Sequence, residues 1–191
     1  MTKILNNLIK KNIQKLITGN FEKLAPTYYR LISEWMNSSY EVFNDIDKYR
    51  IILYLINKDF EHYIQIKKIE SYDNFFMFDK SLELDRINII EISKSLNIPK
   101  ESTRRKILDL EKLNVLQKIG KKIYIDRSAY RLVQPKNTLK NLSALLSKIS
   151  EILKKENLID KSLNVDEVSE HLKENFSYCW YYFYIFIFTL T

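Results

Sequence analysis

Two adjacent arginines, Arg104 and Arg105, stand out among the side chains whose type and spacing could support recognition chemistry. They belong to a polar group within an Ile- and Leu-rich segment: Lys100, Glu101, Ser102, Arg104, Arg105 and Lys106. A guanidinium group can donate two hydrogen bonds to guanine O6 and N7, and a carboxylate can accept one from cytosine N4. Arg105 and Glu101 are therefore candidates for reading base edges, whereas Arg104 and Lys106 would add affinity through phosphates without selecting a sequence.

Positive charge is concentrated in the segment that holds these residues. Residues 97–127 contain nine basic and four acidic residues, a net charge of +5, whereas the whole chain carries +7. Binding to a phosphate backbone requires such a local excess. A basic helix can also be only a solvated surface, and a general bias toward lysine would raise the charge everywhere. That bias does not explain two adjacent arginines near the start of a helix.

Apolar periodicity predicts a short helix before this polar group. Between Ile87 and Leu96, apolar residues at positions 87, 89, 90, 92 and 96 fall mostly on one helical face. Asn97 interrupts the pattern, and Ile98 is disfavoured from helical geometry because Pro99 follows it. Proline suits the first turn of a new helix, where its missing N–H costs nothing. We expect a turn here and a second helix directly after it.

The second helix is predicted to bury one face and to expose the polar group on the other. The residues expected to be buried recur every three or four positions: Thr103, Ile107, Leu110 and Leu113. Two helices joined by a short turn predict a helix-turn-helix, whose second helix enters the major groove of DNA.

A basic β-hairpin is predicted to follow the second helix. After Asn114 the apolar period changes to about two, and Gly120, one of only two glycines, divides the run. A tight turn between strands needs a residue that tolerates positive φ, and glycine supplies it. Lysines gather around this turn: Lys118, Lys121 and Lys122. We expect a small wing whose tip reaches phosphates beside the groove.

The segment IPKESTRRKILDLEKLNVL with its basic hairpin resembles the DNA-binding domain of bacterial winged helix-turn-helix transcriptional regulators of the Crp and MarR kind. The resemblance covers about a fifth of the chain. It implies that Lys100, Glu101 and Arg105 read base edges and that Ser102 and Arg104 lie next to phosphate or base. Asn97 stands where glycine is common, and asparagine also tolerates left-handed geometry. The first 85 residues read as helical, so no cyclic-nucleotide-binding β-roll is expected upstream.

Helices are predicted on both sides of the winged domain, so that the fold is mostly α. Amphipathic patterns cover residues 3–18, 28–43 and 46–63. Asp45 is the expected N-cap of the third helix, whose inward residues would be Tyr49, Ile52, Leu53 and Ile56. Residues 137–156 carry a stripe of leucines that could pair two subunits or pack inside one. A two-fold dimer would match a palindromic DNA site.

Three regions follow from these patterns. Residues 1–71 form an N-terminal helical region, residues 72–132 the winged helix-turn-helix domain, and residues 133–191 a C-terminal helical region for dimerisation or core packing. Residues 73–85 are ambiguous, because they could begin the first helix of the winged domain or form a connection.

The C-terminal run NFSYCWYYFYIFIFTLT carries no charge and is dominated by aromatic and β-branched residues. It is shorter than the roughly 20 apolar residues that span a membrane, and Ser177 interrupts it. A buried core or dimerisation helix is the first interpretation. A wall of a pocket for an apolar effector and a membrane-surface anchor are the alternatives, and a truncated reading frame would also end in this way.

Catalysis is not expected. His62 and His171 are isolated, and the apolar surroundings of Cys179 would raise the pKa of its thiol. Two glycines are too few for a phosphate-binding loop, and no cysteine–histidine cluster has zinc spacing. We therefore predict no enzyme activity, cofactor or metal. The start of the chain lacks the pattern of a secretory leader, and with no integral membrane span expected, a cytoplasmic protein is predicted.

The sequence thus predicts a sequence-specific, double-stranded-DNA-binding transcriptional regulator that could act as a homodimer and respond to a small-molecule effector. One alternative is a replication or plasmid initiator, which a second winged unit would favour, and the sequence shows none. The other is a protein-interaction module, in which the helix and wing contact another polypeptide and DNA binding is absent.

Overall fold

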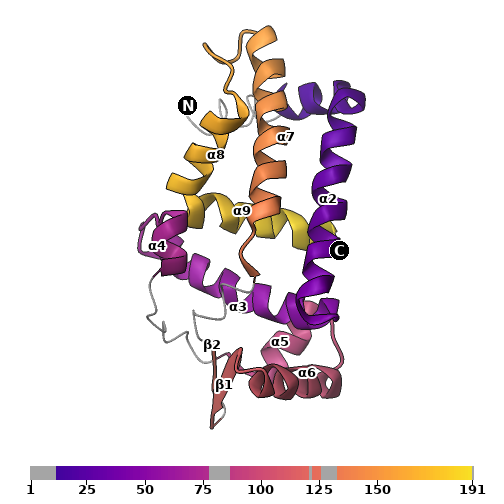
Figure 1. Cartoon of the computed structure of the whole chain (residues 1–191), viewed down its shortest axis with the longest axis vertical. Helices are drawn as coiled ribbons and strands as arrows, with labels where there is room; N and C mark the ends of the chain where they lie inside the picture. The colour runs from indigo at the N-terminus through magenta and orange to yellow at the C-terminus, as the bar shows by residue number, and fades with distance from the viewer. Residues whose placement is uncertain (1–11, 78–86, 121, 126–132, 191) are drawn as a thin grey trace. The chain divides into compact units, whose positions relative to one another are not determined.

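The chain is mostly helical, as predicted, in a computed structural model that describes residues 12–77, 87–120, 122–125 and 133–190 (Figure 1). Residues 12–19 are helical, which covers the described part of the helix expected over residues 3–18. The elements that follow are α2 (Phe21–Phe43), α3 (Ile46–Gln65), α4 (Tyr72–Met77), α5 (Ile89–Leu96), α6 (Lys100–Lys112), β1 (Leu116–Ile119), β2 (Lys122–Ile125), α7 (Lys136–Lys155), α8 (Val165–Glu174) and α9 (Phe176–Leu190).

The elements form two compact units, each made of two separate stretches of chain. One unit combines Met1–Met36 with Pro135–Leu172, and the other combines Asn37–Gln134 with Lys173–Thr191. The division falls within α2 and within α8. The units therefore do not follow the three consecutive ranges predicted from the sequence.

In the first unit, buried hydroxyl groups of α7 hold the segment that leads into α8. The hydroxyls of Ser147 and Ser150 donate to the Leu163 carbonyl, at 2.9 and 3.1 Å. The Leu163 N–H donates back to Ser150 Oγ at 3.0 Å. Asn164 and Glu167 then form a reciprocal capping box at the start of α8. These contacts fix where the chain turns after α7.

The leucine stripe of α7 is only partly buried in this unit. Leu139 and Leu142 are buried, and the remaining members are intermediate: Leu145, Leu146, Ile149 and Leu153. Pairing of two subunits through this stripe stays a prediction.

The second unit is built around α3. Asp45 is the N-cap, as predicted, and its side chain accepts hydrogen bonds from the N–H groups of Asp47 and Lys48. Five residues of α3 have no exposed surface: Ile51, Ile52, Leu53, Leu55 and Phe60. Successive helical residues are rotated by roughly 100°, so these five form a wide buried face of the helix. The predicted inward residues are also confirmed as buried: Tyr49, Ile52, Leu53 and Ile56.

Aromatic side chains of α9 close one side of α3. Phe60 of α3 stacks on Phe75 of α4 and on Tyr184 of α9, with ring centroids 4.9 and 5.8 Å apart. Within α9, Phe176 stacks on Trp180 at 5.0 Å, and both are 1% exposed. These contacts confirm the interpretation of the aromatic run as a core helix.

Ser177, which interrupts the apolar run of α9, is fully buried and has a specific partner. Its backbone N–H donates to the Glu70 carbonyl at 3.0 Å, and its hydroxyl accepts from the Glu70 N–H at 2.9 Å. This reciprocal pair joins the start of α9 to the chain just before α4.

No helix within the described ranges is long and apolar enough to cross a membrane.

The helix-turn-helix segment packs on α3, which the predicted domain range 72–132 leaves out. Both α5 and α6 contact α3, and Figure 1 shows α5, α6 and the β1–β2 hairpin together below it. The helix α4, within the range considered as a first helix of the domain, packs against α9 and, through Phe75, against Phe60 of α3. The range missed α3 because the two packed segments are separated by more than 20 residues of chain.

Replacement of Phe60 by alanine tests the role of this core. The loss of a fully buried aromatic ring shared by three helices should lower the free energy of unfolding by about 3–5 kcal/mol. Denaturant titration followed by circular dichroism measures the change. Tyr182→Ala is the matched control, because Tyr182 lies on α9 but is 50% exposed, and it should change stability by less than about 0.5 kcal/mol. Equal losses in the two variants would contradict this account.

Candidate nucleic-acid interface

The turn between α5 and α6 is fixed by its own backbone and side chains. Asn97 ends α5 in the left-handed region with φ of +52°, the geometry that the sequence allowed for asparagine. The Ile98 N–H donates to the Ser93 carbonyl at 3.1 Å, and the Ser93 hydroxyl donates to the Ile98 carbonyl at 2.7 Å. Ile98 is 4% exposed and anchors the turn in the core.

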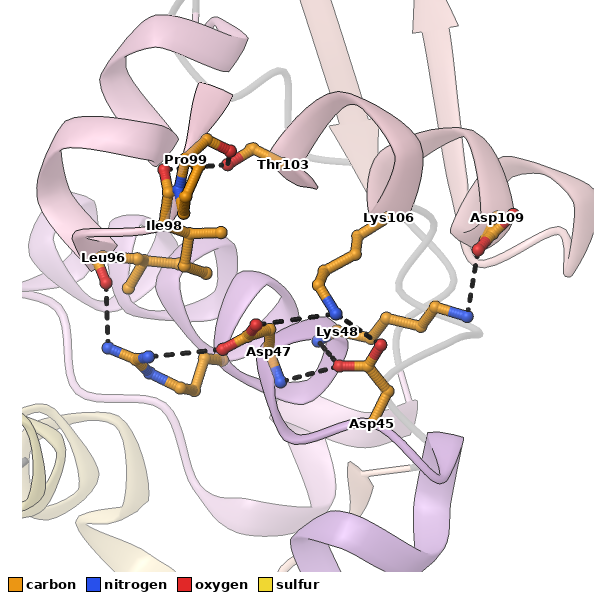
Figure 2. A network of polar contacts seen from close by, with 10 residues as sticks. Asp45, Asp47, Lys48, Leu96, Ile98, Pro99, Thr103, Lys106 and Asp109 are labelled. Atoms are coloured by element: carbon orange, nitrogen blue, oxygen red, sulfur yellow. Dashed lines mark hydrogen bonds and ion pairs between the residues drawn. The ribbon is translucent and has the colours of Figure 1, made fainter. Parts of the chain in front are cut away.

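Two further contacts hold the start of α6 (Figure 2). Pro99 is the N-cap residue, and its carbonyl accepts from the Thr103 N–H at 2.9 Å and from the Thr103 hydroxyl at 3.2 Å. From α3, the Arg50 guanidinium donates to the Leu96 carbonyl at 3.0 Å. The turn therefore has little freedom to change the angle between α5 and α6.

Ion pairs lock α6 onto the first turn of α3 (Figure 2). Lys106 Nζ lies 2.5 Å from Asp45 Oδ2 and 3.5 Å from Asp47 Oδ2. A second pair joins Lys48 Nζ to Asp109 Oδ2 at 3.3 Å. These pairs are partly shielded from water, so they are screened less than fully exposed ones. They fix both the rotation and the position of α6.

Lys106 therefore differs from its predicted role as a phosphate contact. Its side chain is only 21% exposed and faces the carboxylates of α3. Lys106 was grouped with the outward residues because its partner Asp45 lies 61 positions away in the sequence. We assign Lys106 to positioning α6.

Asp45 serves two partners with different oxygens. Oδ1 caps α3, at 3.0 and 3.2 Å from the nitrogens of Asp47 and Lys48, and Oδ2 meets Lys106. Burial alone would raise the pKa of this carboxyl group, but the hydrogen bonds from Lys106 and the two backbone N–H groups outweigh it and lower the pKa. Asp45 is therefore held in its charged form at neutral pH.

The outward face of α6 carries the residues that the sequence singled out. Lys100, Glu101, Arg104 and Arg105 are all exposed, and Ser102 is half-buried. Thr103, Ile107 and Leu110 are buried as predicted. The prediction for Leu113 is wrong, since it is 56% exposed. Leu113 is the C-cap, and Asn114 turns the chain into the left-handed region directly after it, so Leu113 lies beyond the packed face.

Two residues of this face, Glu101 and Arg104, form an ion pair. Arg104 Nε lies 2.9 and 3.0 Å from the two carboxylate oxygens of Glu101, and Arg104 Nη2 also donates to Oε1. The hydrogen bond from Arg104 lowers the pKa of Glu101, and the same contact raises the pKa of Arg104. Arg105 makes no ion pair with any described residue. Among the described residues, the face thus presents a paired guanidinium beside one without an ion pair.

The hairpin follows α6 directly. The strands β1 and β2 pair antiparallel from Leu116 with Ile125 to Ile119 with Lys122, and Gly120 has a φ of +63° at the turn, as expected. Leu116, Ile123 and Ile125 are buried, whereas Lys118 is exposed. Lys121 and the side chain of Lys122 lie outside the described residues. Of the three lysines predicted at the hairpin tip, Lys118 is the one whose side chain the structure describes, and it is exposed.

Sequence reasoning missed the residues of α3 that set the position of α6. Asp45 was singled out only as a helix cap, and neither Asp47, Lys48 nor Arg50 was considered. One signal was present, since all four residues are charged and lie at the N-cap or in the first two turns of α3. That pattern does not identify a partner, because the partner residues belong to another helix.

Comparison with known proteins gives no family for the chain: no family model matches it, and no curated protein or solved structure matches significantly. The resemblance of residues 98–116 to Crp- and MarR-type regulators stays a prediction. Support for a function comes from the geometry of α6 and its surroundings.

Substitutions of Asp45 separate its capping role from its charge. Asp45→Ala removes both and should lower the free energy of unfolding by about 1–2 kcal/mol. Asp45→Asn keeps a capping oxygen and loses only the charge, so the loss should stay below about 1 kcal/mol. Denaturant titration at neutral pH measures both.

The contribution of the Asp45 charge should depend on pH in a defined direction. The folded-state pKa lies below the ordinary value of 3.8, so the charge stabilises the folded state above that value and ceases to do so as the pH falls through the folded-state pKa. The difference in stability between the wild type and Asp45→Asn should therefore be constant near neutrality and vanish in acid. Asp166→Asn, at an exposed carboxylate of α8, is the control. A difference that grows in acid would contradict the assignment.

Proposed function

We propose that this chain is a winged helix-turn-helix regulator that binds double-stranded DNA sequence-specifically, with α6 as the recognition helix. The observation that carries the proposal is the division of α6 into two faces. One face is packed and ion-paired onto α3, and the other presents Lys100, Glu101, Arg104 and Arg105 to solvent. A rigidly held helix with an exposed, hydrogen-bonding face is what direct readout of base edges requires.

The order of residues along α6 suits entry into the major groove. Recognition helices contact bases mainly with their N-terminal residues, and Lys100 and Glu101 are the first two residues of α6. Arg105 follows one turn later on the same half of the helix. The positive end of the helix dipole lies at the same terminus and favours the approach of phosphate. The charge, the position and the exposure of these residues therefore all support α6 as the proposed recognition helix.

The hairpin is proposed as the wing. Three residues separate it from α6, and it exposes Lys118, while Leu116, Ile123 and Ile125 are buried. Lysines in a wing bind the phosphate backbone and supply affinity rather than sequence information. Dimerisation through terminal helices would give two copies of α6 for a palindromic site, and this part of the proposal rests on the half-buried members of the α7 stripe alone.

Loss of both arginines provides the main test. Arg104→Ala/Arg105→Ala should weaken binding to a pool of duplex DNA at least about tenfold at low salt, since each good contact supplies roughly 1–3 kcal/mol. The slope of log K against log salt should become shallower by up to about 0.9, because Arg105, which has no ion pair among the described residues, no longer neutralises a phosphate. Fluorescence anisotropy across a salt series measures both.

The matched control removes two adjacent basic residues elsewhere. Lys154→Ala/Lys155→Ala acts on exposed residues at the end of α7 and should change affinity much less. Absence of binding by the wild type at low salt would overturn the proposal. In that case α6 and the hairpin would be tested as a protein-binding surface.

The wing makes a separate prediction. Lys118→Ala should reduce the salt slope by about 0.9, whereas selection from a randomised duplex pool should return the same sequence as for the wild type. Lys140→Ala, at an exposed lysine of α7, serves as the control for loss of one charge. A changed selected sequence with an unchanged salt slope would show that Lys118 reads bases instead.

A further inference from the structure

We propose that Glu101 is a built-in counter-ion of Arg104 that suppresses binding to non-cognate DNA and releases the arginine only when Glu101 has a base to bind. This inference rests on the proposed function and names a specificity determinant within it. The observation behind it is the bidentate ion pair between Glu101 and Arg104 on the exposed face of α6.

The pair occupies the hydrogen-bonding capacity that a phosphate would use. Arg104 Nε and Nη2 both donate to Glu101, so the side of the guanidinium that best fits two phosphate oxygens is already filled. A phosphate must displace the carboxylate, and it must also approach a second negative charge. On a random DNA sequence, Glu101 gains no new hydrogen-bond donor to replace Arg104. Non-specific binding therefore gains less from Arg104 than from an unpaired arginine.

The pair is weak enough to exchange. The side chains of Glu101 and Arg104 are 67% and 50% exposed, and an ion pair in such surroundings contributes little to stability. A cytosine N4 amino group in the groove can donate to the freed carboxylate. The guanidinium can then turn to a phosphate. With a favourable base, both side chains thus find a new hydrogen-bond partner in the DNA. With an unfavourable base, the carboxylate of Glu101 is left unpaired beside the negatively charged DNA and opposes binding to that sequence.

The two arginines are expected to differ for this reason. Arg104 follows Glu101 by three positions, a spacing that brings helical side chains together. Arg105 is exposed and has no ion pair within the described ranges, so it is available to any DNA. Exchange of partners is therefore assigned to Arg104 alone.

A double-mutant cycle on the full chain tests the inference. Wild type, Glu101→Gln, Arg104→Ala and the double variant are titrated with a mixed-sequence duplex across a salt series. Glu101→Gln should bind about two- to fivefold more tightly at low salt. It should also steepen the salt slope by about 0.9, because Arg104 becomes free to neutralise one more phosphate. In the Arg104→Ala background the same substitution should leave the slope unchanged.

Glu111→Gln is the matched control, because it removes one negative charge from the same helix. Ten residues separate it from Glu101, about 15 Å along the axis, which exceeds the Debye length of about 10 Å at 0.1 M salt. It should not steepen the slope.

The outcomes distinguish this inference from the proposed function. If Glu101→Gln steepens the slope equally with and without Arg104, the carboxylate acts by simple repulsion and the inference is overturned. If the wild type binds DNA but Glu101→Gln changes neither affinity nor slope, the inference fails and the proposed function stands. If the wild type binds no DNA at low salt, both fail.

Discussion

Burial of the apolar face of α3 is the constraint on which the rest of the second unit depends. This face includes Ile51, Ile52, Leu53, Leu55 and Phe60, none of which has exposed surface, so other elements must cover it. Each buried Ile, Leu or Phe contributes roughly 1.5–3 kcal/mol when it leaves water. In this unit α5 and α6 cover part of α3, and the aromatic residues of α9 cover another part. The position of the outward face of α6 is thus a consequence of how α3 is covered.

Apolar packing alone would allow α6 to rotate about its axis, and the polar contacts select one of these rotations. Thr103, Ile107 and Leu110 bring α6 to α3, but comparable burial could be achieved after a small rotation or shift of the helix. Lys106 against Asp45 restricts those alternatives, because a displaced lysine would leave partly buried carboxylates without a partner. The same reasoning applies to Arg50, whose guanidinium meets the carbonyl at the end of α5.

Three basic residues of α6 illustrate how surroundings decide what a charge does. Lys106 is turned toward carboxylates and holds the helix, Arg104 is paired with a neighbour on its own helix, and Arg105 is unpaired among the described residues. The three residues differ only in their contacts: Lys106 has a partner distant in the sequence, and Arg104 has one three positions away on the same helix. Net charge and helical periodicity do not show these contacts, so the sequence analysis placed all three residues in one group.

Local signals in the sequence determined the elements of this protein. Capping by Asp45, the left-handed turn at Asn97, the exit at Asn114 and the glycine of the hairpin each depend on a few neighbouring residues, and the structure has all four. The faces of α3 and α6 were also predictable, because helical periodicity depends on spacing alone. Leu113 was wrongly predicted to be buried, because the three- to four-residue spacing of apolar residues extends to Leu113, whereas the helix ends one residue before it.

Only the tertiary structure decided which elements pack together and which charges are paired. The contact of α3 with α5 and of α9 with α3 joins segments far apart in the chain, and no local pattern identifies such partners. For the same reason the lock between Lys106 and Asp45, 61 positions apart, was invisible in the sequence. The sequence determined the composition of the outward face of α6, and the packing on α3 determined its orientation, because burial selects partners that periodicity leaves open.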